Sequence, residues 1–160
     1  MRPLFHLIFV LLIVLSPSSV FAASEPTQSE NKAADLLDQG KGDEALALLK
    51  QMTEDRPQEA PPHMNYGSIL FTKARVWFQS GHREESTPLF KEAEGHLKKA
   101  AELFAESDGA LKGQCYYLLG DIYSYVYQDQ EKAKEFYQAA LKSHPEHTGA
   151  KKELERLTKV

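Results

Sequence analysis

Hydrophobic residues recur at helical spacing from Gly113 to Pro145, in two runs separated by the polar segment 128–130. In the first run they follow an i, i+3, i+7, i+10 pattern, at Tyr116, Leu119, Tyr123 and Val126. In the second run they are Ala133, Phe136, Tyr137, Ala140 and Leu141. The pattern predicts two antiparallel helices joined by a short polar turn. Two small residues, Gly120 and Ala133, are expected where the helices cross closely.

A shorter hairpin of the same kind is predicted over residues 31–57. Its small and apolar positions are Ala33, Leu36, Ala45, Leu49 and Met52. The segment 40–43 is expected to form the turn, since Gly40 can end one helix and Asp43 can cap the next. The first helix is short and lacks aromatic residues, which is typical of a terminal unit with a neighbour on one side only.

The middle of the chain, residues 62–107, carries the longest helical patterns. The segment 56–62 contains three prolines and is expected to be a loop, because proline removes a backbone donor and disfavours helix in the preceding residue. Two long helices are predicted on either side of Gly81 and His82. Their apolar positions fit two alternative registers that differ by seven residues, which is close to two helical turns. The prediction is one hairpin with each helix about two turns longer than usual.

Residues 146–159 predict a final helix whose apolar side consists of Ala150, Leu154 and Leu157. A helix with so many charged residues is expected to cover the last hairpin and face water. The whole pattern therefore predicts an all-α fold without strands. It consists of hairpins at about 31–57, 62–107 and 110–145, followed by a capping helix.

The hairpin of residues 113–145 resembles a tetratricopeptide (TPR) repeat. That pattern runs large aromatic, Leu-Gly, Tyr, Ala, aromatic, Ala, Pro over about 34 residues. The matching positions are Tyr116, Leu119, Gly120, Tyr123, Ala133, Tyr137, Ala140 and Pro145. Gly120 and Ala133 are 13 residues apart, one more than in the family, and we expect the extra residue in the turn. The resemblance implies a right-handed α-solenoid over residues 31–160 that acts as a non-catalytic adaptor or scaffold for other proteins.

In TPR proteins the first helix of each hairpin lines a concave groove, which holds an extended peptide or a helix of another protein. Carried over by position, the candidate groove residues are Ser68, Phe71, Arg75 and Phe78 in the middle hairpin and Tyr117, Asp121, Ser124 and Tyr125 in the third. The first hairpin offers Ala34, Leu37 and Asp38. Tyrosines at such positions combine apolar area with a hydrogen-bonding tip.

The aromatic members of this set have an alternative role. Phe71, Phe78 and Tyr125 can instead pack against the neighbouring hairpins. Some TPR domains bind a C-terminal carboxylate through Lys and Asn, but Tyr117 and Asp121 occupy those positions in the third hairpin. We therefore predict no carboxylate clamp.

The N-terminal segment 1–22 has the pattern of a signal peptide. Arg2 precedes an apolar run from Leu4 to Leu15, and small residues lead to a predicted cleavage after Ala22. An uncleaved anchor is the alternative, although the run is shorter than the ~20 residues of a membrane-spanning helix. The segment 23–30 is expected to be a disordered tether. We expect an exported protein, in a bacterial periplasm or otherwise secreted, which meets the membrane only transiently through its signal peptide.

Composition narrows the classes of function. The net charge is −4 and charges of both signs are interspersed, whereas a nucleic-acid-binding protein would show a basic stripe. No glycine-rich phosphate loop and no nucleophile–base pair is evident, so neither enzymatic activity nor a cofactor is predicted. His144 and His147 lie three residues apart without further ligands nearby, and a metal site needs three or four. No metal site is predicted.

Two other functions stay open. Cys115 lies at the start of a predicted helix, where a thiol pKa can be lowered, so a thiol or redox role is one alternative. A half-buried structural cysteine is the simpler interpretation, since Cys115 has no CxxC partner and no His or Asp at a spacing that would mark the base of a nucleophile. The other alternative is a homo-oligomeric structural component that associates through the thin first hairpin.

Overall fold

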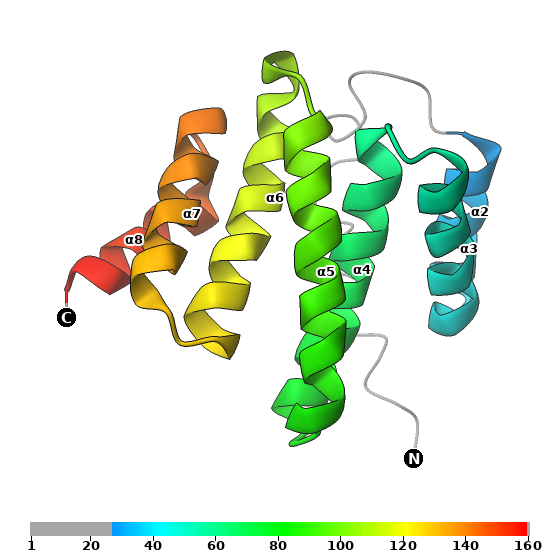
Figure 1. Cartoon of the computed structure of the whole chain (residues 1–160), viewed down its shortest axis with the longest axis horizontal. Helices are drawn as coiled ribbons and strands as arrows, with labels where there is room; N and C mark the ends of the chain where they lie inside the picture. Colours follow the sequence, from blue (N-terminus) through cyan, green and yellow to red (C-terminus); the bar gives the residue numbers. More distant parts are fainter. Residues whose placement is uncertain (1–26, 160) are drawn as a thin grey trace.

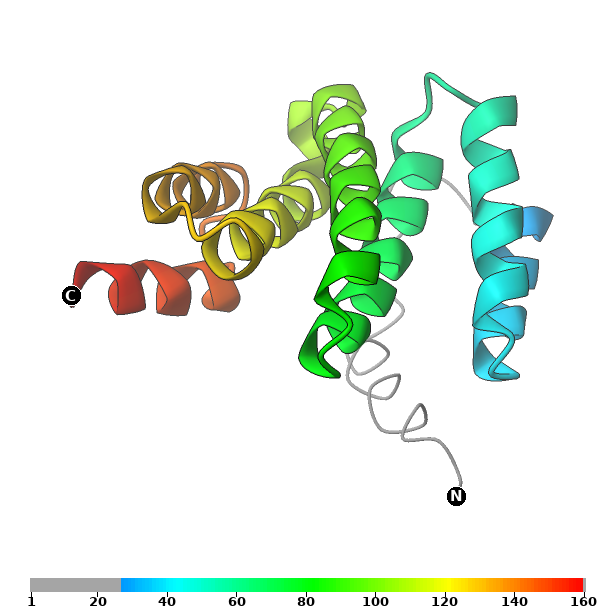
Figure 2. The same cartoon turned by 60° about the horizontal axis from the view of Figure 1, so that its bottom comes forward.

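The computed structural model describes residues 27–159, and over this range it contains seven α-helices and no β-strand. The helices are α2 (Gln28–Asp38), α3 (Gly42–Asp55), α4 (Ala60–Gln79), α5 (Arg83–Leu103), α6 (Gly109–Asp121), α7 (Gln130–Ser143) and α8 (Thr148–Thr158). A 3-10 turn η1 (Glu106–Asp108) precedes α6, and a π-helical turn η2 (Ile122–Val126) follows it. Successive helices form antiparallel hairpins that stack side by side (Figures 1 and 2). This confirms the predicted all-α solenoid of three hairpins and a final helix.

The first helix begins earlier than predicted. The Thr27 hydroxyl accepts a hydrogen bond from the Glu30 N–H at 3.3 Å, and the Glu30 carboxylate accepts one from the Thr27 N–H at 2.7 Å. This reciprocal capping box starts α2 at Gln28. The predicted tether 23–30 was therefore too long at its C-terminal end. The predicted signal peptide 1–22 lies outside the described residues.

The loop predicted over residues 56–62 is also shorter in the structure. Helix α4 begins at Ala60 and carries Pro61 and Pro62 in its first turn. The first N–H groups of a helix have no acceptor within the helix, so a proline costs little there. Pro57 lies in the loop as predicted, whereas Pro61 and Pro62 lie on the helix side of the boundary.

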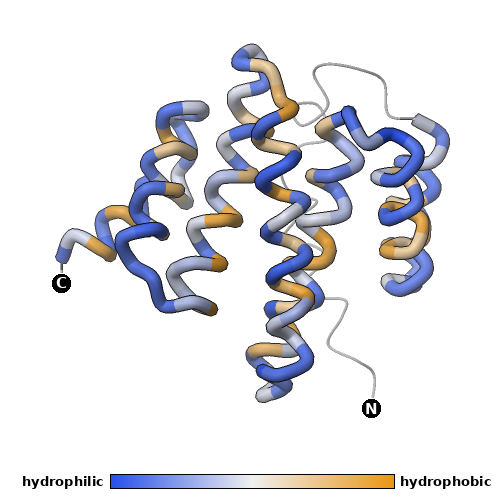
Figure 3. Tube along the Cα trace, viewed as in Figure 1, coloured by the Kyte–Doolittle hydropathy of each residue, from blue (hydrophilic) through white to orange (hydrophobic). Residues whose placement is uncertain are grey.

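The middle hairpin has the predicted extra length. Helices α4 and α5 have 20 and 21 residues, whereas the helices of the other hairpins have 11 to 14. Figure 1 shows the turn end of α5 extending beyond the neighbouring helices. Both predicted registers contribute to the buried core, with Gly67, Leu70, Ala74, Ser86, Phe90, Ala93, Leu97 and Ala100. In Figure 3, hydrophobic positions accordingly recur along α5 between hydrophilic ones.

The third hairpin crosses at Gly120 as predicted. A Cβ atom on Gly120 would lie 2.5 Å from Cδ1 of Tyr137, so this position has no room for a side chain. The residue inserted relative to the TPR pattern is taken up mainly in η2, at the end of the first helix. There the Tyr127 N–H bonds to the Ile122 carbonyl at 3.2 Å, the wide i to i+5 spacing of a π-helix. Gln128 then adopts a left-handed conformation with φ of 57°.

A polar cluster ties the middle hairpin to the third. The Glu94 carboxylate of α5 accepts hydrogen bonds from the hydroxyls of Tyr123 at 2.6 Å and Tyr127 at 2.9 Å. Lys98 donates a third bond to it at 2.5 Å. Burial alone would raise the pKa of Glu94, but these bonds outweigh it and the pKa is lowered. The carboxylate is therefore ionised at neutral pH and holds η2 against α5.

Candidate partner-binding groove

The four candidate groove residues of the middle hairpin include an exposed arginine and a packed aromatic pair. Arg75 is exposed, and its guanidinium lies 5.5 Å from the centroid of the Phe71 ring. Phe71 itself is only 4% exposed and contacts Phe90 edge-on, with ring centroids 5.8 Å apart. Phe78 is half-buried and lies 6.0 Å from the same ring. Phe71 and Phe78 thus belong to the packing of α4 on α5, the alternative role considered for them.

Ser68 lies on α4 beside this group. Its hydroxyl oxygen is buried and has no hydrogen-bond partner among residues 27–159. A hydroxyl in a helix can turn back to the carbonyl four residues earlier at little cost. Its burial nevertheless removes Ser68 from the set of freely accessible groove positions.

Asp121, the acidic candidate of the third hairpin, is buried instead of exposed. The Tyr137 hydroxyl donates a hydrogen bond of 2.8 Å to its carboxylate. Burial raises the pKa of Asp121 to about 6, against the opposing effects of the Tyr137 bond and of the Arg75 charge. The negative charge expected from Asp121 is partly neutralised by a proton near neutral pH.

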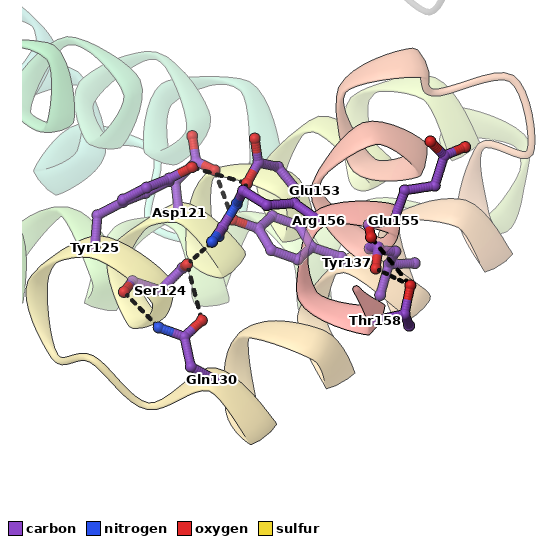
Figure 4. A network of polar contacts seen from close by, with 10 residues as sticks. Asp121, Ser124, Tyr125, Gln130, Tyr137, Glu153, Glu155, Arg156 and Thr158 are labelled. Atoms are coloured by element: carbon purple, nitrogen blue, oxygen red, sulfur yellow. Dashed lines mark hydrogen bonds and ion pairs between the residues drawn. The ribbon is translucent and has the colours of Figure 1, made fainter. Parts of the chain in front are cut away.

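The other three candidates of the third hairpin are contacted by α8 and the residue before it, and Figure 4 shows the contacts of Ser124 and Tyr125 with α8. The Tyr117 ring lies 4.7 Å from His147, which directly precedes α8, and 5.9 Å from Tyr137. The Tyr125 hydroxyl donates to Glu153 at 2.8 Å. The Ser124 hydroxyl accepts a hydrogen bond of 2.8 Å from Arg156. The final helix therefore contacts the α6–η2 end of the candidate groove, where Tyr125 remains 50% exposed.

The candidate residues of the first hairpin remain accessible. Ala34 and Asp38 on α2 are exposed and Leu37 is half-buried. Ala34, Asp38 and Arg75 are thus exposed candidate positions, and Tyr125 beside α8 is also 50% exposed. The accessible candidate positions away from α8 lie on α2 and α4.

Cys115 is fully buried, with an exposed fraction of 0%. Burial raises the pKa of its thiol to about 12, so the thiol is protonated at neutral pH. A reactive cysteine needs a lowered pKa and access to solvent. The structure therefore argues against the thiol or redox alternative.

No group of three or more His, Cys, Asp or Glu side chains within residues 27–159 is arranged to hold a metal ion. His144 and His147 lie with ring centroids 5.8 Å apart. Both ring nitrogens of His147 are engaged in other hydrogen bonds, to Gln114 and to the Ala150 N–H.

Among the helices of residues 27–159, none combines the length and the hydropathy that a membrane-spanning segment needs.

One buried pair was not predicted from the sequence. Nδ1 of His63 on α4 lies 2.9 Å from Nδ1 of His96 on α5, and Nε2 of His63 lies 3.2 Å from the Pro57 carbonyl. His96, expected to be an exposed helix residue, is half-buried, and the edge of Tyr66 packs against it. The available hint was position, because His63 precedes Gly67 by one turn and His96 adjoins Leu97, across the same helix crossing.

Comparison with known proteins places the fold. The first TPR domain of Spaghetti (RPAP3), solved bound to the HSP90 peptide SRMEEVD, is similar at a TM-score of 0.53 and 20% identity, covering 82% of this chain and 88% of that one. The first TPR domain of human RPAP3 gives a TM-score of 0.52 and 20% identity, with coverage of 82% and 87%. No protein-family model and no curated protein matches the sequence. The chain thus has the TPR fold.

Proposed function

We propose that this chain, whose fold is that of TPR domains, is a non-catalytic protein–protein interaction module that docks a peptide or helix of a partner in its concave groove. The supporting observation is the accessible row of groove positions on α2 and α4, with Ala34, Asp38 and the exposed Arg75. Stacked hairpins commonly present such an extended concave surface to partners. The fold alone does not imply a function, so the proposal depends on these positions.

The RPAP3 neighbour was solved with an HSP90 peptide, which makes an extended peptide a reasonable class of ligand here. This chain differs where a carboxylate clamp would lie. Asp121 is bonded to Tyr137, and Tyr117 packs between Tyr137 and His147. We therefore propose that the partner is bound through its side chains and backbone along α2 and α4, and not through a terminal carboxylate.

We further propose that the module works in an exported compartment, the periplasm of a bacterium or the extracellular space. The support is the signal-peptide pattern of residues 1–22. Fusion of residues 1–30 to a reporter enzyme that is active only after export tests this. Activity of the fusion, lost when Ile8, Val10 and Leu12 are replaced by Asp, is expected. An inactive fusion that stays with the cytoplasmic fraction would contradict export.

The proposed groove is tested by paired charge reversals on the same hairpin. Arg75→Glu changes the exposed arginine of α4, which stacks on Phe71 at 5.5 Å. The matched control is Arg83→Glu, because Arg83 is also exposed and stacks on Phe78 at 4.9 Å, but lies at the hairpin turn. Each variant serves as bait for crosslinking capture from an extract of the source cells. A partner captured by the parent and by Arg83→Glu, but lost with Arg75→Glu, is the expected result.

Equal capture by all three baits would place the binding surface elsewhere. Capture of nothing but further copies of the chain, with a molecular mass in solution that rises with concentration, would favour the self-associating structural component instead. Circular dichroism of both variants controls for loss of the fold.

A further inference from the structure

Helix α8 contacts the α6–η2 end of the groove through side chains of opposite charge. Glu153 accepts from the Tyr125 hydroxyl at 2.8 Å, and Arg156 donates to the Ser124 hydroxyl at 2.8 Å (Figure 4). The guanidinium of Arg156 also lies 5.2 Å from the centroid of the Tyr125 ring. Glu153 and Arg156 are themselves paired at 2.8 Å, one helical turn apart. The face made by Tyr117, Ser124 and Tyr125 thus contacts a helix that presents an acidic and a basic side chain, Glu153 and Arg156, one turn apart.

The apolar part of this contact is small. Within Thr148–Thr158, Ala150 is the only buried residue, while Leu154 and Leu157 are partly buried against α7. Figure 3 shows α8 as a largely hydrophilic helix with few hydrophobic positions. Helices of this length are marginal in water unless tertiary contacts stabilise them. The docking of α8 therefore depends on few apolar contacts and on its polar contacts, which include the cap at its N-terminus.

The N-terminus of α8 is held by His147 in a defined protonation state. Nδ1 of His147 accepts a hydrogen bond from the Ala150 N–H at 3.2 Å, so this nitrogen carries no proton. Nε2 lies 3.1 Å from the Gln114 Oε1 and donates its proton there. A second proton on Nδ1 would abolish the cap and place a positive charge at the helix N-terminus, where the helix dipole disfavours it.

The surroundings of His147 also disfavour the charged ring. Burial lowers the pKa of His147, and His144 at the end of α7 lowers it further. From α6 the ring faces Tyr117 and the neutral amide of Gln114. In the chain on either side, Glu146 and Lys151 pair with each other at 3.3 Å.

We propose that α8 is an acid-releasable cover of the α6–η2 face, and that this face, once uncovered, binds a partner helix which presents an acidic and a basic side chain one turn apart. This inference rests on the proposed function and names the partner chemistry and the regulation of the same groove. Protonation of His147 removes the cap of α8, so Tyr117, Ser124 and the part of Tyr125 that α8 contacts become available; Tyr125 is 50% exposed while α8 is docked. The α2–α4 part of the groove stays accessible at either pH.

The direction of the effect follows from linkage. The docked state holds His147 neutral, whereas the released ring takes up a proton near its ordinary pKa of 6.5. Release is therefore favoured as the pH falls below that value. If the docked ring stays neutral, one such group can shift the equilibrium by at most about 30-fold between pH 7.5 and 5. Asp121 acts in the opposite direction, since its raised pKa of about 6 means that acid favours its buried, protonated form.

Amide hydrogen exchange of the full chain tests the release of α8. The protection factors of residues 150–158, corrected for intrinsic exchange, are expected to fall by about 10-fold to 30-fold from pH 7.5 to pH 5 relative to those of α3. His147→Asn retains a capping side chain that cannot be protonated, so this variant should keep its protection. His144→Asn is the matched control and should follow the parent. Equal acid sensitivity in the parent and in His147→Asn, or none in either, would overturn the proposal.

A peptide of residues 148–159 tests the uncovered face. At pH 5 it is expected to shift the backbone NMR signals of Tyr117, Ser124 and Tyr125, and at pH 7.5 to leave them in place. The same peptide with Glu153→Ala and Arg156→Ala should bind at least about 10-fold more weakly. Absence of shifts at pH 5 would overturn the proposed docking face. If α8 is released but Arg75→Glu still captures the same partner, the proposed function fails while this inference stands.

Discussion

Replacing Gly120 by alanine probes the helix crossing on which the third hairpin depends. An added Cβ would lie 2.5 Å from Cδ1 and 2.9 Å from Cζ of Tyr137. The Tyr137 ring cannot easily move away, because it is fully buried and its hydroxyl is bonded to Asp121 at 2.8 Å. The substitution must therefore shift α6 against α7 or displace the ring.

Helix propensity and overpacking act in opposite directions on the free energy of unfolding of Gly120→Ala. Alanine in place of glycine inside a helix stabilises it by about 1 kcal/mol through propensity. Overpacking of a filled core costs about 1–3 kcal/mol and sometimes more. With a fixed aromatic ring as the neighbour, the upper part of that range applies, so Gly120→Ala should lower the free energy of unfolding by about 1–2 kcal/mol net. Gly120→Leu should cost several kcal/mol.

The assay is urea unfolding followed by circular dichroism, with two glycines of the middle hairpin as controls. Gly95 lies in α5 with nothing within 4 Å of its Cβ position, so Gly95→Ala should stabilise the chain by about 0.5–1 kcal/mol. Gly67 is intermediate, with Leu97 Cγ at 3.0 Å. If Gly120→Ala proves as stable as Gly95→Ala, the steric argument for the crossing is refuted.

Three further outcomes are expected from urea unfolding. Ala133→Asp should cost about 3 kcal/mol or more, because Ala133 is fully buried and the new carboxylate would have no partner; a parent-like midpoint would contradict the assigned crossing. Asp121→Asn should stabilise the chain at pH 7 by about 1–3 kcal/mol, since the pKa of Asp121 is raised from 3.8 to about 6 and the ionised form is disfavoured there. This gain should vanish below pH 4, and a gain that persists would exclude ionisation as its cause. Burial and the adjacent His63 lower the pKa of His96, so the parent should lose stability below pH 6.5 and His96→Asn should lose less; identical pH profiles would show that folding does not lower the pKa of His96.

The helices and their pairing followed from the sequence because each hairpin carries its own periodicity. The helical spacing of hydrophobic residues around Gly120 and Ala133 is a local pattern, and so are the two registers of the middle hairpin. The buried positions in the structure confirm both. The helix start at Gln28 was also readable, since Thr27 and Glu30 have the spacing of a capping box. It was missed because the preceding polar composition suggested a tether.

The groove could be predicted less well, because exposure there depends on contacts between distant segments. Phe71 is covered by Phe90 of the next helix, and Tyr125 is bonded to Glu153, 28 residues further along the chain. The His63–His96 pair joins residues 33 apart. The π-turn η2 illustrates a third limit. One extra residue was visible in the spacing, but its position is decided by backbone hydrogen bonds.

The central proposal is that a partner protein lies along α2 and α4. The most direct measurement places a photoreactive amino acid at position 75 and, as a control, at position 83, and maps the crosslinked peptides by mass spectrometry. Arg75 is exposed beside the candidate groove and Arg83 is exposed at the hairpin turn. We predict one discrete segment of one partner protein crosslinked from position 75 and absent from position 83. The same adduct from both positions, or from position 83 alone, would contradict the proposal.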